Sequence, residues 1–478
     1  MKTYNLRYIA LCSIFVAPSA LITSAQAQNL TDSDITTATQ LRQQAMTGNN
    51  VAYELVESLT TEVGARPGGS PADALAVAWA GEKLKSMGFD RVWTEPVSFP
   101  YWNRKAESAR LIAPNDQHLA ITALGGSPRT PSGGVQAQVV HFTNLEALQA
   151  AEDNSLDGKI AFISNRMERA RDGSGYGVAV QARSNGPEVA ANKGAAALLI
   201  RSIGTDNDRL PHAGNTRQPQ AGSAIVPAAA LSNPDADQLV RLLERGITPI
   251  VHLDLDVGFE GTAISHNVFA EVTGQQNPDD FLLLAAHLDS WDMGTGAIDD
   301  GAGVAIITAA AKLILDLEQK PKRSIRIGLF ANEEQGLFGG FSFLEKLKQD
   351  NENNPLQHLI MAVESDFGAG RIYRIDARVN DPGWQLVEKI HPLLEPIGIT
   401  LGENNKPGGS DIFPLINAGA ANIALRQDGT TYFDYHHTDN DTLDKIEPGA
   451  LNQNVAAYAV LSWLIAQDQI NLGSGTLN

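Results

Sequence analysis

The 478-residue chain contains one cysteine, Cys12, which lies in a short apolar stretch near the start of the sequence. Without that stretch the chain cannot form a disulfide bond or use a cysteine nucleophile. Positive charge is also scarce, because 36 Lys and Arg stand against 55 Asp and Glu and give a net charge of −19. A surface of this sign repels nucleic acid and anionic membranes, so we exclude both as partners. No run beyond residue 27 reaches the roughly 18 apolar residues of a membrane span, so we expect no membrane attachment of the mature protein.

The first 27 residues have the pattern of a secretion signal. Lys2 and Arg7 supply a positive start, residues 8–16 are almost wholly apolar, and Ala25 and Ala27 flank Gln26 in a small-x-small cleavage pattern. We therefore predict that residues 1–27 are a signal peptide and that the mature protein is exported, either to a periplasm or to the outside of the cell.

The rest of the chain has the composition of a globular protein, with 43% hydrophobic and 19% charged residues, and changes in texture divide it into three parts. Residues 28–107 show helical patterning and then a strand at 91–97, and we assign them to the amino-terminal part of the domain that resumes at residue 257. Residues 108–256 alternate short β-branched runs with Gly, Pro and Asn clusters, around two predicted helices at 187–193 and 236–245. Because this β-rich module holds no tight cluster of acidic and histidine residues, we interpret it as an inserted lid or shape-providing domain.

Residues 257–478 alternate strands with helices. The predicted strands are 267–272, 281–286, 324–331, 359–363 and 421–425, and the predicted helices are 304–316, 337–349, 382–395 and 451–467. Several of these strands are apolar on both faces, as buried parallel strands are. We therefore predict an α/β fold in which a mixed, mainly parallel sheet is flanked by helices, with ligands bound beyond the carboxyl ends of the strands.

Acidic and histidine residues collect at the predicted carboxyl ends of these strands. They are His287, Asp289, Asp299, Glu333, Glu334, Glu364, Asp366, His436 and His437. Carboxylates gathered in one place repel each other unless a cation neutralises them, and a set of His, Asp and Glu without Cys suits zinc or a similar divalent ion.

The number of candidate ligands favours two metal ions, because one catalytic zinc takes about three protein ligands. The ligands of this two-metal hypothesis are His287, Asp299, Glu334, Asp366 and His437. Asp299 would bridge the ions, with His287 and Asp366 on one and Glu334 and His437 on the other. Glu333 then remains free to take a proton from the metal-bridging water or hydroxide and return it to the leaving amine. Asp289 is predicted to accept the proton of the second imidazole nitrogen of His287 and so to fix its tautomer.

Five segments resemble the carboxypeptidase Q, or plasma glutamate carboxypeptidase, branch of the co-catalytic zinc aminopeptidase family. They are His287–Gly303, Asn332–Gly336, Glu364–Asp366, Gly409–Asp411 and His436–Thr442. The resemblance extends over nearly the whole mature chain, and the middle module is similar to the protease-associated domain inserted in this branch. It implies a zinc-exopeptidase fold, two Zn²⁺ per chain on the five ligands above, Glu333 as general base, and a cis peptide between Asp299 and Asp300. It also suggests a homodimer.

Some assignments have alternatives. His436 and His437 are adjacent, and alignment on the following Thr438 favours His437 as the ligand. Asp411 matches a family position near the substrate pocket, but its position also suits the N-cap of a helix at 412–416. A group of aromatic residues either lines the mouth of the pocket or packs in the core: Tyr432, Phe433 and Tyr435. We assign no role to Asp292 or Asp300.

We therefore predict an exported di-zinc exopeptidase that hydrolyses dipeptides or short peptides, with the middle module restricting access to short substrates. One alternative is a non-catalytic peptidase-like receptor or scaffold, and another is an aminopeptidase that acts on longer peptides. The complete ligand set argues against the receptor. An aminoacyl cyclase of the same fold uses one zinc and lacks the module. The residues leave open whether the amino or the carboxyl end of the substrate is recognised.

Overall fold

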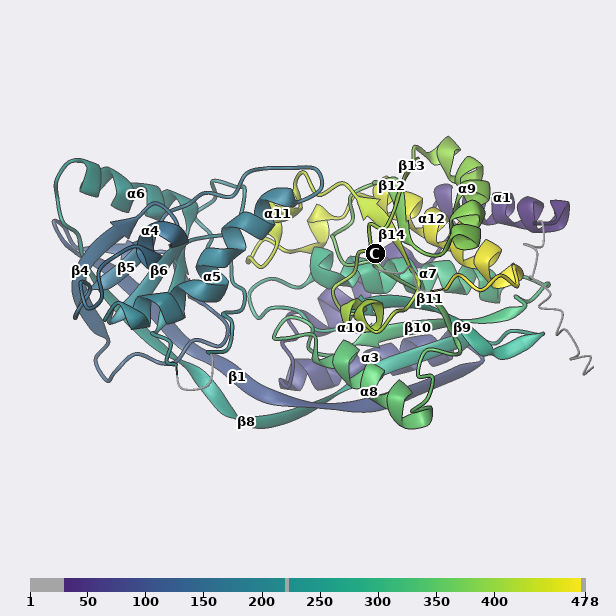
Figure 1. Ribbon diagram of the computed structural model, residues 1–478, viewed down its shortest axis with the longest axis horizontal. Helices are drawn as coiled ribbons and strands as arrows, with labels where there is room; N and C mark the ends of the chain where they lie inside the picture. The colour runs from purple at the N-terminus through teal and green to yellow at the C-terminus, as the bar shows by residue number, and fades with distance from the viewer. Residues whose placement is uncertain (1–29, 220–222, 474–478) are drawn as a thin grey trace, which may run out of the picture.

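The structure is a computed structural model that describes residues 30–219 and 223–473, so the predicted signal peptide and Cys12 lie outside the described residues. Within this part of the chain, one 14-stranded sheet runs through two lobes (Figure 1). Its order is β13 (Thr400–Asn404), β12 (Ile372–Arg378), β14 (Asn422–Gln427), β11 (Leu359–Glu364), β9 (Asn277–His287), β10 (Arg323–Phe330), β8 (Ile250–Val272), β4 (Val135–Phe142), β5 (Ile160–Ile163), β6 (Ala197–Arg201), β7 (Ala228–Leu231) and β3 (Ile121–Ala123). Beside this path, β1 (Arg91–Ala113) pairs with β8, and β2 (Gln117–Leu119) pairs with β1.

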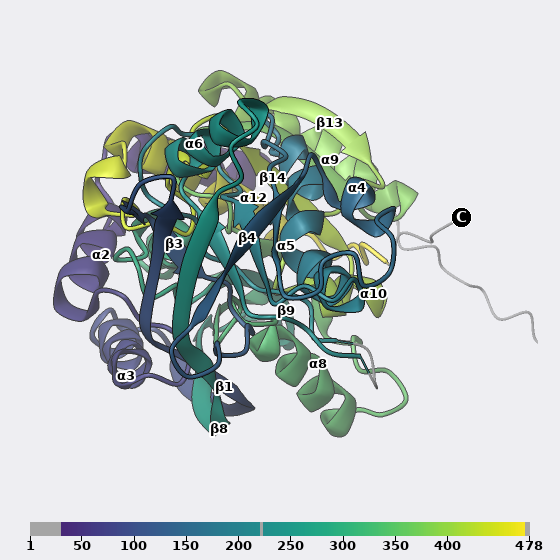
Figure 2. The same ribbon diagram turned by 90° about the vertical axis from the view of Figure 1, so that its left-hand side faces the viewer.

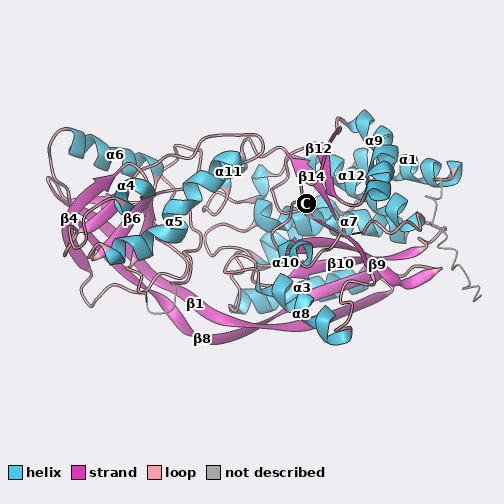
Figure 3. Ribbon diagram, viewed as in Figure 1, coloured by secondary structure: helices cyan, strands magenta, loops and turns pink. Residues whose placement is uncertain are grey.

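The first lobe is built on the parallel strands β10, β9, β11 and β14. Along β9, Leu282 and Leu284 enter one hydrophobic core while Phe281 and Leu283 enter another, so both faces of this strand are apolar and covered. The helices of the first lobe that pack in the first core are α1 (Asp32–Met46), α2 (Ala52–Ser58), α3 (Pro71–Ser86), α7 (Ala302–Leu315), α9 (Asp381–Leu394) and α12 (Pro448–Gln467). Helices α8 (Phe338–Asp350) and α10 (Phe413–Asn417) cover the other core. The predicted mainly parallel sheet with flanking helices is confirmed (Figure 3).

The second lobe contains β3 to β7 together with α4 (Leu145–Gln149), α5 (Ser174–Asn192) and α6 (Asn233–Glu244). Figure 2 views this lobe end-on, with α6 above the strands and α4 and α5 beside them. A core of its own joins Phe162 and Leu199 of the parallel strands to Leu239 of α6 and Leu253 of β8.

Strands β1 and β8 form a long antiparallel ribbon that links the two lobes. The sequence predicted only the first part of β1, a strand at 91–97, because Pro100 interrupts the pattern beyond it. Proline removes a backbone donor, which is tolerated on a strand with a free edge. Pro96 and Pro100 both precede residues 109–111, the part of β1 that pairs with β2. Among the described residues, β8 is the only strand paired with the segment that contains the two prolines.

Helix α5 is much longer than the predicted helix at 187–193. Proline is typical of the first turn of a helix, so Pro187 indicated a start, but it lies inside α5. The helix packs closely on β6, because a Cβ atom at Gly186 would lie 2.9 Å from Leu198 Cδ2. Close packing of this face therefore outweighs the low helix propensity of Gly186 and Pro187.

The remaining short elements are η1 (Leu59–Val63), η2 (Ala297–Gly301), η3 (Glu395–Ile397), α11 (Tyr432–Tyr435) and η4 (Leu443–Lys445). Among the described residues, no helix combines the length and the apolar character that a membrane crossing requires.

Candidate metal centre

The carboxyl ends of β9, β10 and β11 lie at one edge of the sheet, and the polar residues that follow them meet there. His287 is the last residue of β9, Glu333 and Glu334 follow β10, and Asp366 follows β11. The turn η2 before α7 brings Asp299 to the same point. Asp289 and His437 lie beside these five residues, so the structure brings together all seven of the predicted ligand and proton-transfer residues.

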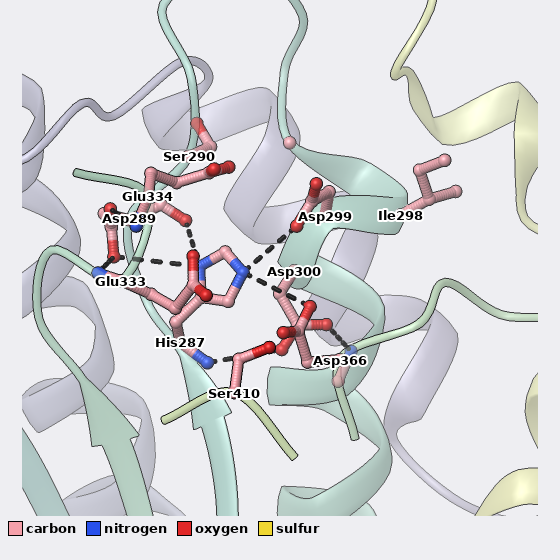
Figure 4. Close-up of polar contacts among 12 residues, drawn as sticks. His287, Asp289, Ser290, Ile298, Asp299, Asp300, Glu333, Glu334, Asp366 and Ser410 are labelled. Carbon is pink, nitrogen blue, oxygen red and sulfur yellow. Dashed lines mark hydrogen bonds and ion pairs between the residues drawn. The ribbon is translucent and has the colours of Figure 1, made fainter. Parts of the chain in front are cut away.

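Asp299 lies between two imidazole rings. Its Oδ1 atom is 3.0 Å from Nε2 of His287, and its Oδ2 atom is 3.3 Å from Nε2 of His437. His287 Nε2 is also 3.5 Å from Asp366 Oδ1, and His437 Nε2 is 3.0 Å from Glu334 Oε2. Figure 4 shows Asp299 and Asp366 on one side of the His287 ring and Asp289 on the other.

The electrostatics of this cluster are those of a cation site. Burial disfavours the charged form of both imidazoles, but the surrounding carboxylates outweigh it and raise the pKa of His437 to about 10 and the pKa of His287 well above its usual range. Burial raises the pKa of Glu334 to about 7, although His437 opposes the shift. Without a metal, protons on these histidine and glutamate side chains balance the negative charge of the carboxylates, which a divalent ion would neutralise when bound.

The donor atoms fit zinc in type and position. Two groups have ligand atoms within 4.8 Å of one another: His287, Asp299 and Asp366, and Asp299, His436 and His437. Asp299 belongs to both groups. The buried oxygens Asp299 Oδ2 and Glu334 Oε1 accept no hydrogen bond from the described residues, although buried polar atoms rarely lack a partner. Metal ligation would satisfy both of them.

Both adjacent histidines lie beside Asp299, and their rings stack with centroids 3.5 Å apart. His436 Nε2 is 3.6 Å from Asp299 Oδ2, farther than His437, and no contact with Glu334 is present for it among the described residues. Burial, together with the neighbouring His437 ring, holds the pKa of His436 well below its usual range. The contacts of His437 with two carboxylates favour it as the ligand.

Asp289 lies behind the two glutamates. Its carboxylate accepts hydrogen bonds from the backbone N–H of Glu333 at 3.0 Å and of Glu334 at 3.3 Å. His287 Nδ1 lies 3.0 Å from the main-chain oxygen of Asp289 and 3.7 Å from its carboxylate, so the carbonyl is the nearer acceptor for the ring proton. Burial raises the pKa of Glu333 well above its usual range, and the nearby Asp366 and Glu334 add to the shift.

The turn that carries Asp299 is held by Asp441, whose carboxylate accepts the backbone N–H groups of Ala297, Ile298 and Asp299. The peptide between Asp299 and Asp300 is cis. Asp300 accepts the N–H of His287 at 3.2 Å, while Asp292 pairs with Arg104 at 3.0 Å, away from the ligands.

Asp411 is not the N-cap of a helix. Helix α10 begins after Ile412 without a side-chain cap, and the backbone N–H groups of Ser410, Asp411 and Ile412 donate to the carboxylate of Glu364 instead. The Asp411 carboxyl is buried without a hydrogen bond to the described residues, and burial raises its pKa well above the usual range.

A cavity of about 760 Å³ opens beside the centre. One side carries the acidic and histidine residues, and the other side belongs to the second lobe, with Tyr176, Arg183, Asn215 and Arg217. Tyr432 and Phe433 line it and also pack on each other with centroids 5.0 Å apart, so for these two both interpretations hold. Tyr435 lines a separate cavity of about 130 Å³.

Residues of the second lobe make hydrogen bonds to the loop that carries His436 and His437. The sequence analysis did not predict this contact. His212 Nδ1 is 2.7 Å from the main-chain oxygen of His436, and His212 Nε2 is 2.7 Å from Asp206 Oδ1. Ala213 donates its N–H to the oxygen of His437 at 2.9 Å, and its own oxygen lies 3.2 Å from His437 Nδ1.

Asn215 extends this contact to the glutamates, because its side-chain amide donates to the main-chain oxygen of Glu334 at 2.7 Å. Residues so far from their partners along the chain leave no local pattern. The one local signal for the contact between His212 and His436 is the pair of Asp206 and His212, which are six residues apart.

Comparison with known proteins places the chain among peptidases. The model of "Peptidase family M28" matches residues 267–462. Carboxypeptidase Q of Bos taurus is 34% identical over 418 residues, which span 87% of this chain and 85% of the relative. Carboxypeptidase Q of Homo sapiens is 33% identical, over 87% of this chain and 85% of its own length.

Solved structures agree. The Peptidase M28 precursor from Shewanella amazonensis SB2B has a TM-score of 0.90 and 49% sequence identity, and the match covers 94% of this chain and 100% of that one. An aminopeptidase from Aneurinibacillus sp. strain AM-1, at 22% identity and a TM-score of 0.60 over 94% and 98% of the two chains, shares the fold. The predicted fold class is confirmed by these matches.

Proposed function

Because this chain belongs to peptidase family M28 and is a zinc-dependent metallopeptidase, we propose that it is an exported exopeptidase that holds two zinc ions and hydrolyses dipeptides or short peptides. The observation that carries this proposal is the position of Asp299, with one carboxylate oxygen toward His287 and the other toward His437. A carboxylate shared between two groups of ligands is the arrangement that two-metal hydrolases use.

The proposed ligands divide into two groups around Asp299. His287 and Asp366 would hold one ion, and Glu334 and His437 the other. When bound, zinc polarises a peptide carbonyl and lowers the pKa of water at the site. The contact between His437 Nδ1 and the oxygen of Ala213 supports this assignment, because it leaves Nε2 free to face the carboxylates and a metal.

Glu333 would move the proton. It lines the cavity beside Glu334 and Asp366, and its raised pKa suits a group that accepts a proton from the attacking water and then gives it to the leaving amine. Asp289 would position this step, because its carboxylate holds the backbone of both Glu333 and Glu334.

The remaining assignments complete the proposal. Residues 1–27 would direct export and be removed. Residues 28–107 and 257–478 would form the peptidase domain, and residues 108–256 an inserted domain that limits substrate length. The second lobe forms one wall of the cavity, which supports that limit. The homodimer stays a prediction, which sedimentation of the purified protein would test.

The test combines zinc analysis with activity. Wild type should contain about two zinc ions per chain and hydrolyse a panel of dipeptides. Glu333→Gln should keep its zinc and lose about 10²- to 10⁴-fold in kcat. Glu352→Gln, at an exposed glutamate that does not line the cavity, is the matched control and should behave as wild type. A folded wild type that hydrolyses no peptide after zinc is supplied would refute the proposal and favour a receptor or scaffold.

A further inference from the structure

The two sides of the 760 Å³ cavity differ in charge. The side formed by the first lobe carries Asp299, Glu333, Glu334 and Asp366, whose charge zinc would largely neutralise. The side formed by the second lobe carries two arginines, Arg183 of α5 and Arg217.

Arg183 is a buried cation without an acidic partner. Its side chain is 6% exposed, and it donates to the main-chain oxygen of Ala213 at 3.0 Å and to the hydroxyl of Tyr176. Both acceptors are neutral, and its Nε atom has no hydrogen-bond partner among the described residues. Within the described residues, no carboxylate lies within 4.0 Å of this guanidinium, although buried charges are normally paired.

Arg217 stands next to Arg183 in space. Its backbone N–H donates to the oxygen of Ser184, the residue that follows Arg183, at 2.9 Å. Arg217 is exposed and lines the same cavity, and its side chain makes no ion pair with the described part of the chain. Two guanidinium groups therefore border one cavity without an anion to balance them.

We propose that Arg183 and Arg217 form a subsite for a carboxylate of the peptide substrate, either at its free carboxyl end or on the side chain of its last residue. This assignment rests on the proposed exopeptidase function. Arginine binds carboxylates through paired, charge-assisted hydrogen bonds, and the buried Nε of Arg183 is a donor without a partner among the described residues.

The geometry also gives the subsite a place in the reaction. Glu333 and the ligands line the same cavity as the two arginines, so a peptide held by its carboxylate would present a bond near its carboxyl end to the centre. Asn215, which bonds the oxygen of Glu334, lies two residues before Arg217 and ties the subsite to the glutamate pair. The second lobe thus selects the end of the substrate as well as its length.

The experiment measures kcat/KM of the zinc-loaded enzyme for three substrates: alanyl-alanine, its carboxyl-terminal amide, and the amide of alanyl-aspartate. The first offers an α-carboxylate, the second offers none, and the third offers only a side-chain carboxylate. Wild type should prefer a carboxylate-bearing substrate to the plain amide by at least 10-fold. Arg217→Ala should reduce this preference 10- to 100-fold, mainly through KM, and Arg217→Lys should restore part of it because it keeps the charge.

Arg245→Ala, at an exposed arginine of the second lobe that does not line the cavity, is the control and should keep the wild-type preference. Preference for alanyl-alanine assigns the subsite to the α-carboxylate, and preference for the aspartyl amide assigns it to a side chain. Equal hydrolysis of all three by wild type, or an unchanged preference in Arg217→Ala, would overturn the subsite while leaving the exopeptidase intact. Loss of all hydrolysis in zinc-loaded wild type would instead refute the proposed function.

Discussion

Replacing His212 tests whether the second lobe builds the metal centre. The ring is 1% exposed and touches two acceptor oxygens, the carboxylate of Asp206 and the main-chain carbonyl of His436, each at 2.7 Å. His212→Ala would leave both oxygens buried without this partner. Each unsatisfied group costs about 1–3 kcal/mol, so two of them give an expected loss of stability of about 2–6 kcal/mol.

The functional effect should fall on the ion that His437 is proposed to hold. Groups that orient a metal ligand change metal affinity by about 10- to 100-fold when they are removed. His212→Ala should therefore lower the affinity for one zinc ion by this factor, as measured by competition with a chromophoric chelator. His212→Asn keeps a donor near the position of Nδ1, and His212→Gln keeps one near Nε2. Because Nδ1 faces the His436 carbonyl, we expect His212→Asn to retain more zinc affinity than His212→Gln.

The control is His252→Ala, which removes a partly exposed histidine of β8 whose ring contacts the oxygen of Gly133. It should leave zinc affinity unchanged. Folded His212 variants that bind both ions as tightly as wild type would show that this contact serves stability alone, and the reasoning that links the second lobe to the centre would fail.

Three further outcomes are expected. Burial raises the pKa of Asp73 from 3.8 to about 6, so its contribution to stability is present below about pH 4 and about 3 kcal/mol is lost as the pH rises through 6. Asp73→Asn, which can still bond Gly69 and Ser265, should lack this loss in urea unfolding between about pH 3 and about pH 7, and parallel pH curves for the two proteins would contradict it. Asp441→Asn should cost about 1–3 kcal/mol and weaken zinc binding, read by thermal unfolding and chelator competition, because an amide N–H would face the N–H of Asp299. Removing zinc with a chelator should lower Tm, and added zinc should restore it in a concentration-dependent way. A Tm that does not change when zinc is removed or added would argue against a resident metal.

Much of the candidate site could be predicted from the sequence because each part is local. His287, Glu333 and Asp366 follow apolar runs that predict buried strands, and residues after parallel strands meet at one edge of the sheet. The order of strands along the chain was therefore enough to predict that these residues lie close together. The sequence was less informative for α5 and β1, because Pro187 and Pro100 resemble element boundaries when their packing partners are unknown.

The sequence by itself determined the alternation of strands and helices, the acidic and histidine groups at the strand ends, and the residue types that suit a divalent ion. Tertiary structure decided which lobe faces the centre. The contacts of His212 with His436 and of Asn215 with Glu334 join residues more than 100 positions apart, and the two arginines become neighbours only when the loop of Arg217 bonds to α5. Local pattern records the hydrophobic periodicity of single elements, whereas pairing between distant loops depends on how the whole sheet folds and brings its lobes together.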